Sequence, residues 1–299
     1  MRRVRLGDAS GIVELGRVVD PNVLSTPATM EALLKGEAPA TTERLVGESN
    51  GRVVAWAPSG IYESGTAWFW IGVRPQFRGR GIGGAVYDRI EERLRAEAAD
   101  RIETTPNDDK GRSFLTSRGF EVSATVRVSE IDPGRVSALA RPPAGVEVVA
   151  LREVIDRPAV LFELYSQGRA DVPSHAARTP WSFPEWRAET VDHPLLDLDA
   201  SVVVLEHGEP VSLAWLYSDR EGRRAEALMA ATRRDPRGRG LATIAKIEST
   251  QRAAGLGITR IVTSNDLDNR PMLVINEKLG YTPTVVIESY AKPLVGRHS

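Results

Sequence analysis

Hydrophobic positions recur along the chain with two spacings, one typical of helices and one typical of strands. In residues 81–99, Ile82, Val86, Ile90 and Leu94 share one helical face with Arg and Glu opposite, which predicts an amphipathic helix. An Asn-Gly turn at 50–51 separates two short apolar runs and predicts a pair of antiparallel strands. Residues 67–73 are predicted to form a further strand, and residues 112–118 a short helix.

The same order of elements restarts in the second half. The pattern predicts strands at 146–151, 201–206, 211–217, 225–232 and 258–263, and helices at 159–167, 241–255 and 271–279. In each half several antiparallel strands precede a glycine-rich loop, whereas in a Rossmann fold such a loop follows the first strand of a parallel sheet. We therefore expect a mixed α/β fold, a mostly antiparallel sheet with flanking helices, present as two domains in tandem.

The segment between the halves has a different composition. Residues 132–145 are rich in Pro, Gly, Ala and Arg, which is typical of a stiff, polar linker. The expected organisation is an N-terminal domain at 1–131, this linker, and a C-terminal domain at 146–299. A length of 299 residues agrees with two domains.

A glycine-arginine loop occurs in both halves. Arg78-Gly79-Arg80-Gly81-Ile82-Gly83 reappears 159 residues later as Arg237-Gly238-Arg239-Gly240-Leu241-Ala242. Each copy follows an apolar stretch, opens a helix, and is followed by a Gly-aromatic pair, Gly119-Phe120 or Gly280-Tyr281, which indicates a duplicated domain. The first N–H groups of a helix have no intrahelical partner, glycine lets a ligand approach the backbone, and arginine adds charge. The loops therefore predict a phosphate or oxyanion ligand; a flexible surface turn is the alternative for either copy taken alone.

These loops carry a family resemblance. Gln76-Phe77-Arg78-Gly79-Arg80-Gly81 resembles the Gln/Arg-x-x-Gly-x-Gly/Ala signature of the GNAT superfamily of acyl-CoA-dependent N-acyltransferases. The second copy departs only at its first position, Asp235, and residues 263–281 resemble the superfamily's final helix and strand. The two-domain layout is similar to that of mycothiol synthases.

The resemblance implies acetyl-CoA or another acyl-CoA as cofactor. Its pantetheine arm would pair with the backbone of Ile71, Gly72 and Val73, or of Ala230, Ala231 and Thr232. Its pyrophosphate would lie on residues 78–83 or 237–242, and Asn269 is a further expected cofactor contact.

Acyl transfer by direct attack needs a general base for the amine and a proton for the leaving thiolate. In many GNAT enzymes the base is a carboxylate on the strand before the loop; Glu226 occupies that strand in the second half, whereas residues 65–73 contain no carboxylate. Glu226 follows two arginines near a strand start, so a solvated surface charge is the alternative. The acid is usually a Tyr four residues before the terminal Gly, but these positions hold Leu115 and Asn276. We assign Glu226 and Asn276 as the catalytic candidates, which makes the C-terminal domain the expected catalytic one.

Composition narrows the function further. A net charge of −1 argues against nucleic acid or an anionic membrane as partner, and no apolar run is long enough to span a bilayer, so a cytoplasmic location is expected. The absence of cysteine excludes disulfides, thiolate metal sites and an acyl-cysteine intermediate, and the histidines have no metal-binding spacing. The chain has 34 Arg against 5 Lys, which hints at a GC-rich bacterial genome.

The expected function is transfer of an acetyl group to the amine of a small molecule in a ternary complex, by a monomer or homodimer. Two alternatives stay open. One is a catalytically inactive acyl-CoA-binding or interaction protein, because Tyr is missing at both acid positions. The other is an acetyltransferase like mycothiol synthase.

Overall fold

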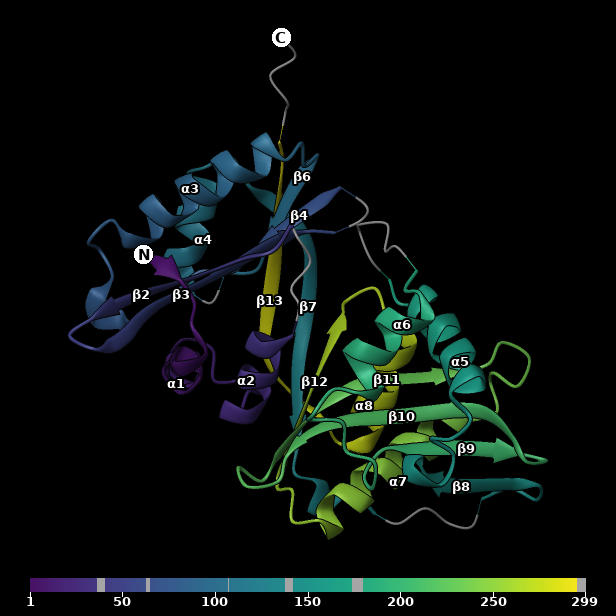
Figure 1. The fold of residues 1–299 in the computed structure, drawn as a ribbon. Coiled ribbons are helices and arrows are strands. Elements are labelled where there is room, and N and C mark those ends of the chain that lie inside the picture. The colour runs from purple at the N-terminus through teal and green to yellow at the C-terminus, as the bar shows by residue number, and fades with distance from the viewer. Residues whose placement is uncertain (37–40, 63–64, 107, 138–141, 174–179, 295–299) are drawn as a thin grey trace. The chain divides into compact units, whose positions relative to one another are not determined.

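The computed structural model describes residues 1–36, 41–62, 65–106, 108–137, 142–173 and 180–294. The chain forms two compact units. Unit 1 comprises Met1–Thr125 and the C-terminal end from Ile287, and unit 2 comprises Val126–Val286. Figure 1 shows the elements of both.

The sheet of unit 1 is mostly antiparallel, and β4 and β6 run parallel to each other. Its strands follow the order β1-β2-β3-β4-β6-β13-β7, and β5 pairs with β3 off this path. Their bounds are Arg2–Arg3 (β1), Glu43–Ser49 (β2), Arg52–Ile61 (β3), Thr66–Phe69 (β4), Gly72–Val73 (β5), Arg101–Thr104 (β6), Glu121–Ile131 (β7) and Thr282–Pro293 (β13).

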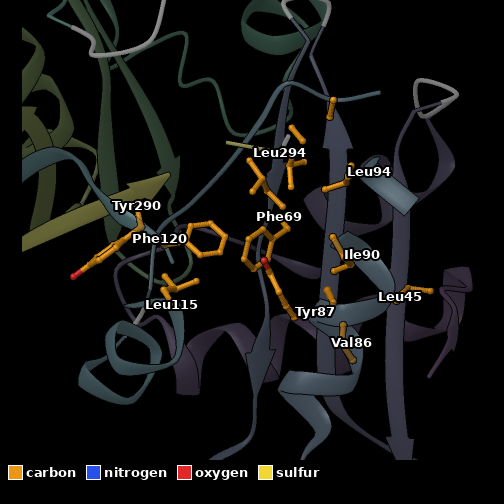
Figure 2. Packing of buried hydrophobic residues seen from close by; sticks show 14 residues of the cluster. Leu45, Phe69, Val86, Tyr87, Ile90, Leu94, Leu115, Phe120, Tyr290 and Leu294 are labelled. Atoms are coloured by element: carbon orange, nitrogen blue, oxygen red, sulfur yellow. The ribbon is translucent and has the colours of Figure 1, made fainter. Parts of the chain in front are cut away.

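Helices cover both faces of this sheet because its strands alternate between two apolar clusters. Leu45 and its neighbour Val46 on β2 belong to different clusters, as residues on opposite faces of a strand must. Helices α1 (Ala9–Val19) and α2 (Pro27–Lys35) pack on the Val46 side. Helices α3 (Ile82–Ala96) and α4 (Asp109–Thr116) pack on the Leu45 side, where Figure 2 shows the buried side chains.

Unit 2 repeats this arrangement with the strand order β7-β12-β11-β10-β9-β8. The bounds are Val146–Ala150 (β8), Val202–Glu206 (β9), Glu209–Asp219 (β10), Arg224–Thr232 (β11) and Arg260–Asp266 (β12). Helices α5 (Pro158–Ala170) and α6 (Phe183–Trp186) pack on one face around the fully buried Trp186 and Trp215. Helices α7 (Leu241–Gly255) and α8 (Arg270–Leu279) lie on the other face.

The two units exchange the ends of their last strands. Residues 126–131 of β7 pair with β12 in unit 2, although the chain reaches them directly from unit 1. Conversely, residues 290–293 at the end of β13 pair with β6 in unit 1. The division at 131 and 146 expected from sequence stays a prediction, and residues 138–141 of the expected linker lie outside the described residues. The compact units differ from it through this exchange, which no local sequence pattern encodes.

The predicted fold class, mixed α/β with a mostly antiparallel sheet and flanking helices, is confirmed. One predicted element differs. Residues 67–73 form two strands, β4 and β5, because Pro58 of β3, which accepts from the Trp70 N–H at 3.0 Å, has no N–H to donate in return. Helix α2 and strands β6 and β13 were not predicted.

Candidate functional site

Strands β11 and β12 run side by side over a short distance only. Their parallel pairing covers residues 224–226 of β11 and 260–262 of β12, so the last pair is Glu226 with Val262. Beyond that pair each strand continues without the other. We call this point of separation the C-terminal fork.

Unit 1 has an equivalent N-terminal fork, where the pairing of β4 with β6 ends at Trp68 and Glu103. The strands before the two forks differ. The register of β11 against β10 shifts next to Trp215 and Leu216 and leaves Leu228 as an extra residue, which is a β-bulge. In unit 1, β4 and β5 keep one register against β3. Of the two strands, β11 therefore carries a bulge next to its fork and β4–β5 does not.

Past each fork, the strand turns polar backbone groups away from its remaining neighbour. The Arg233 N–H donates to the Val211 carbonyl at 2.9 Å, which makes these two residues a hydrogen-bonded pair. In an antiparallel ladder the hydrogen-bonding direction alternates, so Ala230 and Thr232 point their N–H and C=O groups away from β10, whereas Ala231 points toward it. The Arg74–Val54 bond, also 2.9 Å, sets the same alternation in unit 1. Ile71 and Val73 face outward there, and Gly72 faces β3.

Both glycine-arginine loops fold in the same way. Gly79 and Gly81, like Gly238 and Gly240, have φ between 75° and 79°, a left-handed conformation that favours glycine. A Cβ at any of the four would meet no atom within 4 Å, so the space beside the loops is open. Gly83 and Ala242 lie in the first helical turns, and the side chains of Ile82 and Leu241 pack into the apolar clusters. The loops thus present the unpaired N–H groups of a helix start to an open space, which fits a phosphate.

The first arginine of each loop holds the loop against its strand. Arg78 Nε donates to the Val73 carbonyl at 2.9 Å, and Arg237 Nε donates to the Thr232 carbonyl at 3.0 Å. The guanidinium of Arg78 also pairs with Asp108, the N-cap of α4.

Two carboxylates pair with the arginines of the C-terminal loop, and the sequence did not predict either contact. Asp171 binds Arg237 and Arg234, and Arg237 holds the pKa of that carboxyl below its ordinary value. Glu206 binds Arg239 through both oxygens at 2.6 and 3.0 Å, and Arg239 likewise lowers the pKa of Glu206. Both carboxylates come from elements far away in sequence. Both carboxylates contact the loop arginines, to which a bound anion would also be attracted.

The α8 side of the C-terminal fork is polar. Asn276 is 1% exposed and donates through Nδ2 to Asn265 Oδ1 on β12 at 2.7 Å, but its own Oδ1 has no partner. Thr263, the residue after the last pair, directs its hydroxyl to the same Asn265 oxygen at 3.4 Å. Asn269, a predicted cofactor contact, is the N-cap of α8 and accepts from the Met272 N–H at 3.4 Å. An unsatisfied buried acceptor is costly, so Asn276 fits a ligand that donates a hydrogen bond.

The corresponding region of unit 1 is apolar, and a hydrogen bond joins its two strands. Leu115 takes the place of Asn276 and lies beside the rings of Phe69, Tyr87 and Phe120, as Figure 2 shows. These rings contact one another at centroid distances of 5.5 to 6.0 Å. Thr104, the counterpart of Thr263, donates to the Phe69 carbonyl at 2.7 Å and so ties β6 to β4 just past their fork. The N-terminal fork is therefore closed by packing and a hydrogen bond.

Glu226 lies opposite Tyr217 of β10, on the face that α5 and α6 cover. The Tyr217 hydroxyl donates to the Glu189 carbonyl at 2.6 Å, and the His193 ring stacks on Tyr217 at 4.3 Å. Burial raises the pKa of Tyr217, and the Glu189 and Glu226 carboxylates raise it further. His193 Nδ1 accepts from the Leu195 N–H at 3.2 Å, and burial lowers the pKa of this imidazole.

Sequence reasoning missed Tyr217, His193 and Glu189. The fold places these residues near Glu226. From the sequence, only the position of Tyr217 could have been predicted, because strand alternation places residues 213, 215 and 217 on one face of β10.

Comparison with known families agrees with this geometry. The family model described as "Acetyltransferase (GNAT) family" matches residues 21–120 and 165–281. The chain belongs to the GNAT acetyltransferase family. The two matched regions fall in the two copies of the duplicated unit, so the protein is a tandem GNAT.

Several solved structures share the fold. The chain is similar to a tandem GNAT protein from the clavulanic acid biosynthesis pathway, with 18% identity over 98% of each chain and a TM-score of 0.76. It is also similar to a GCN5-related N-acetyltransferase from Sphaerobacter thermophilus, with 17% identity over 99% of this chain and 96% of that one and a TM-score of 0.73. A GCN5-related N-acetyltransferase from Kribbella flavida matches at 17% identity over 98% of this chain and 97% of that one, with a TM-score of 0.52.

Membership of the GNAT family supports acyl transfer as the general chemistry, with acyl-CoA as the donor that this family generally binds. Among the described residues, no helix is both long and apolar enough to cross a membrane. The same part of the chain contains no group of three or more His, Asp or Glu side chains placed to hold a metal ion.

Proposed function

We propose that this tandem GNAT transfers an acetyl group from acetyl-CoA to the amine of a small molecule, and that unit 2 carries the site. The contrast between the two forks supports the choice of unit 2. Asn276, Asn265 and Thr263 line the C-terminal fork, whereas Leu115 and the Thr104–Phe69 hydrogen bond close the N-terminal one.

The residues of unit 2 fit an acyl-CoA. Arg237–Ala242 would hold the pyrophosphate, and the outward backbone groups of Ala230 and Thr232 would hold the pantetheine arm. Acetyl-CoA, when bound, supplies an acetyl group activated as a thioester. The bulge at Leu228 bends β11 away from β12, which leaves this edge of β11 without a strand partner past Glu226 among the described residues.

Glu226 would act as general base for the acceptor amine. It is half-buried at the fork, on the face of Tyr217 and His193, so an amine bound between α6 and the sheet would meet a carboxylate there. Its counterpart in the first copy is Ala67, which cannot take a proton. Asn276, with its unpartnered Oδ1, would orient the ligand from the α8 side; it cannot donate a proton to the thiolate as a tyrosine does.

Calorimetric titration with acetyl-CoA of the wild type and the Gly238→Glu and Gly79→Glu variants tests the assignment. Both substitutions add a carboxylate at a positive φ where space is open, so they match in strain and in charge. We expect one acetyl-CoA per chain, binding at least tenfold weaker in Gly238→Glu and unchanged in Gly79→Glu. The reverse ranking would move the site to unit 1.

A catalytically inactive acyl-CoA-binding protein is the second candidate, and the asparagine at position 276 favours it. A panel of small amines assayed for CoA release separates the two. Tight acetyl-CoA binding without turnover of any amine would favour the inactive protein.

A further inference from the structure

His193 comes from a segment that flanks β10 on the side opposite to β11. Past the last residue pair of β9, Leu196 forms an antiparallel bridge with Tyr217, while Glu226 of β11 pairs with Tyr217 from the other side. The imidazole stacks on the Tyr217 ring, with centroids 4.3 Å apart and planes at 21°. Tyr217 is thus in contact with His193 and next to Glu226, so a ligand that reaches both of these residues passes along its ring.

A hydrogen bond at one ring nitrogen determines the protonation of His193. Nδ1 accepts from the Leu195 N–H at 3.2 Å, so the single proton of the neutral ring is on Nε2. A second proton, on Nδ1, would break that bond, and burial also lowers the pKa of this imidazole. His193 is therefore a neutral hydrogen-bond donor.

The Nε2–H group of His193 is free to bind a ligand. It has no hydrogen-bond partner in the part of the chain that the structure describes. The residue is half-buried, but Nε2 does not belong to the buried atoms that lack a partner, so solvent reaches it. The bond from Leu195 and the stack on Tyr217 hold the ring in place. A donor that is already held in position loses little freedom when it binds a ligand.

The first copy of the duplicated unit lacks this combination of side chains. Ile61 pairs with Ala67 there, where Tyr217 pairs with Glu226 in the second copy. The sequence also contains no histidine before residue 175. The imidazole, the phenol ring and the carboxylate therefore occur together in the unit that is proposed to carry the site, and the shared fold does not require them.

The charge near Tyr217 limits what His193 can bind. Burial raises the pKa of Tyr217, and the Glu189 and Glu226 carboxylates raise it further, so negative charge lies close to this ring. A carboxylate on the acceptor would be repelled there, and a neutral imidazole offers no counter-charge to it. A hydroxyl or carbonyl oxygen accepts a hydrogen bond without bringing charge.

We infer that His193 determines the specificity of unit 2 for its acceptor: its Nε2–H donates to a neutral hydroxyl or carbonyl oxygen that the acceptor amine carries. The acceptor class is then an amino alcohol, amino sugar or amino amide rather than an amino acid or a plain alkylamine. The inference rests on the proposed function, because it assumes that the amine is the group presented to Glu226.

Three linear amines of equal chain length test the inference in an assay of CoA release from acetyl-CoA. Aminopentanol carries a hydroxyl, pentylamine lacks it, and aminopentanoate carries a carboxylate instead. We expect wild-type kcat/KM to be about three- to tenfold higher for aminopentanol than for pentylamine, as one neutral hydrogen bond provides, and lowest for aminopentanoate.

Variants at His193 assign the preference to its N–H group. His193→Phe keeps a ring on Tyr217 but removes the donor, so the ratio of aminopentanol to pentylamine should fall to about one. His193→Gln keeps an N–H group and should retain a ratio above about two. His207→Asn, which removes an exposed imidazole at a positive φ that suits asparagine, is the control and should keep the wild-type ratio. Urea unfolding verifies that each variant is folded.

The outcomes separate this inference from the proposed function. Acetylation of these amines with equal ratios in wild type and His193→Phe, or a preference for aminopentanoate, would overturn the inference and leave the proposed function standing. Acetyl-CoA binding without acetylation of any amine would reject the proposed function, and the inference with it.

Discussion

Glu226 and Tyr217 lie directly opposite each other on β11 and β10, at the last residue pair before β11 leaves β12. Before this pair β11 and β12 are joined within the sheet, and after it these two parallel strands separate. A carboxylate at this position is held by two neighbouring strands while its side chain lies next to the fork. The fold therefore fixes the proposed base more firmly than a loop would.

Replacing this carboxylate by an amide tests its role. We expect Glu226→Gln to lower kcat by about 100-fold or more, because a positioned base contributes roughly 10²–10⁴ in rate, and to change acetyl-CoA affinity less than twofold. Steady-state kinetics and calorimetry measure the two effects. Glu221→Gln, in the exposed turn before β11, is the matched control and should leave both unchanged. An unchanged kcat in Glu226→Gln would remove the proposed base.

The buried amine of Lys246 predicts an unusual pH dependence of stability. Burial lowers the pKa of Lys246 from 10.5 to about 8, so the folded state resists protonation. The penalty is fully present below pH 8 and disappears as the pH rises from about 8 to 10.5. Lys246→Met should therefore be more stable than wild type at pH 7, by up to about 3 kcal/mol, and the difference should shrink toward pH 10.

Urea unfolding at pH 7, 8.5 and 10 measures this difference. Lys292→Met provides a control of opposite sign, because removing the ion-paired amine takes a hydrogen-bond donor from the Tyr87 hydroxyl and one of two cations from Glu91, which keeps Arg95. A Lys246→Met variant that is less stable than wild type at pH 7 would contradict the prediction.

The pairing of Arg239 with Glu206 predicts that the Glu206 carboxylate competes with a bound phosphate for the Arg239 guanidinium. The pair is bidentate and partly exposed, so it is weak in water but must open when Arg239 turns to a phosphate. We expect Glu206→Gln to raise acetyl-CoA affinity by about two- to fivefold at low salt, with a smaller gain at 0.5 M salt. Calorimetry at two salt concentrations tests it, with Glu209→Gln as control. Weaker binding in Glu206→Gln would show that Glu206 supports the ligand instead.

The exchanged strand ends predict which fragment folds. Residues 126–286 contain the part of β7 that pairs with β12, whereas residues 146–299 lack it. Losing that strand leaves β12 as an open sheet edge, which favours aggregation. We expect the 126–286 fragment to unfold cooperatively in urea and the 146–299 fragment to be aggregated or unfolded. Circular dichroism and size-exclusion chromatography distinguish these states, and a well-folded 146–299 fragment would show that the exchange is dispensable.

Much of the fold could be predicted because its signals are local. The helices at α3, α7 and α8 follow from apolar spacing, and the positive φ of Gly81 and Gly240 follows from a glycine before each helix. The duplication was visible because the loops are sequence motifs.

The parts that were missed depend on contacts between distant residues. Nothing near Lys292 indicates that it reaches Glu91, and nothing near Asp171 indicates that it binds Arg237. The strand at β4 and β5 was predicted as continuous because apolar residues fill 67–73, whereas the interruption at Trp70 depends on how β3 pairs. Helix α2 has a weak apolar stripe and no buried residue, so its sequence carries little of the usual signal.

The exchange of strand ends also sets an order for events on the ribosome. Strand β6 of unit 1 pairs with residues 290–293, which are made only after all of unit 2. The first copy therefore cannot complete its sheet while the second is still being translated, and folding from the N-terminus onward is blocked at that edge. The duplication has in this way joined two repeats whose sheets are completed together, once residues 290–293 have been made.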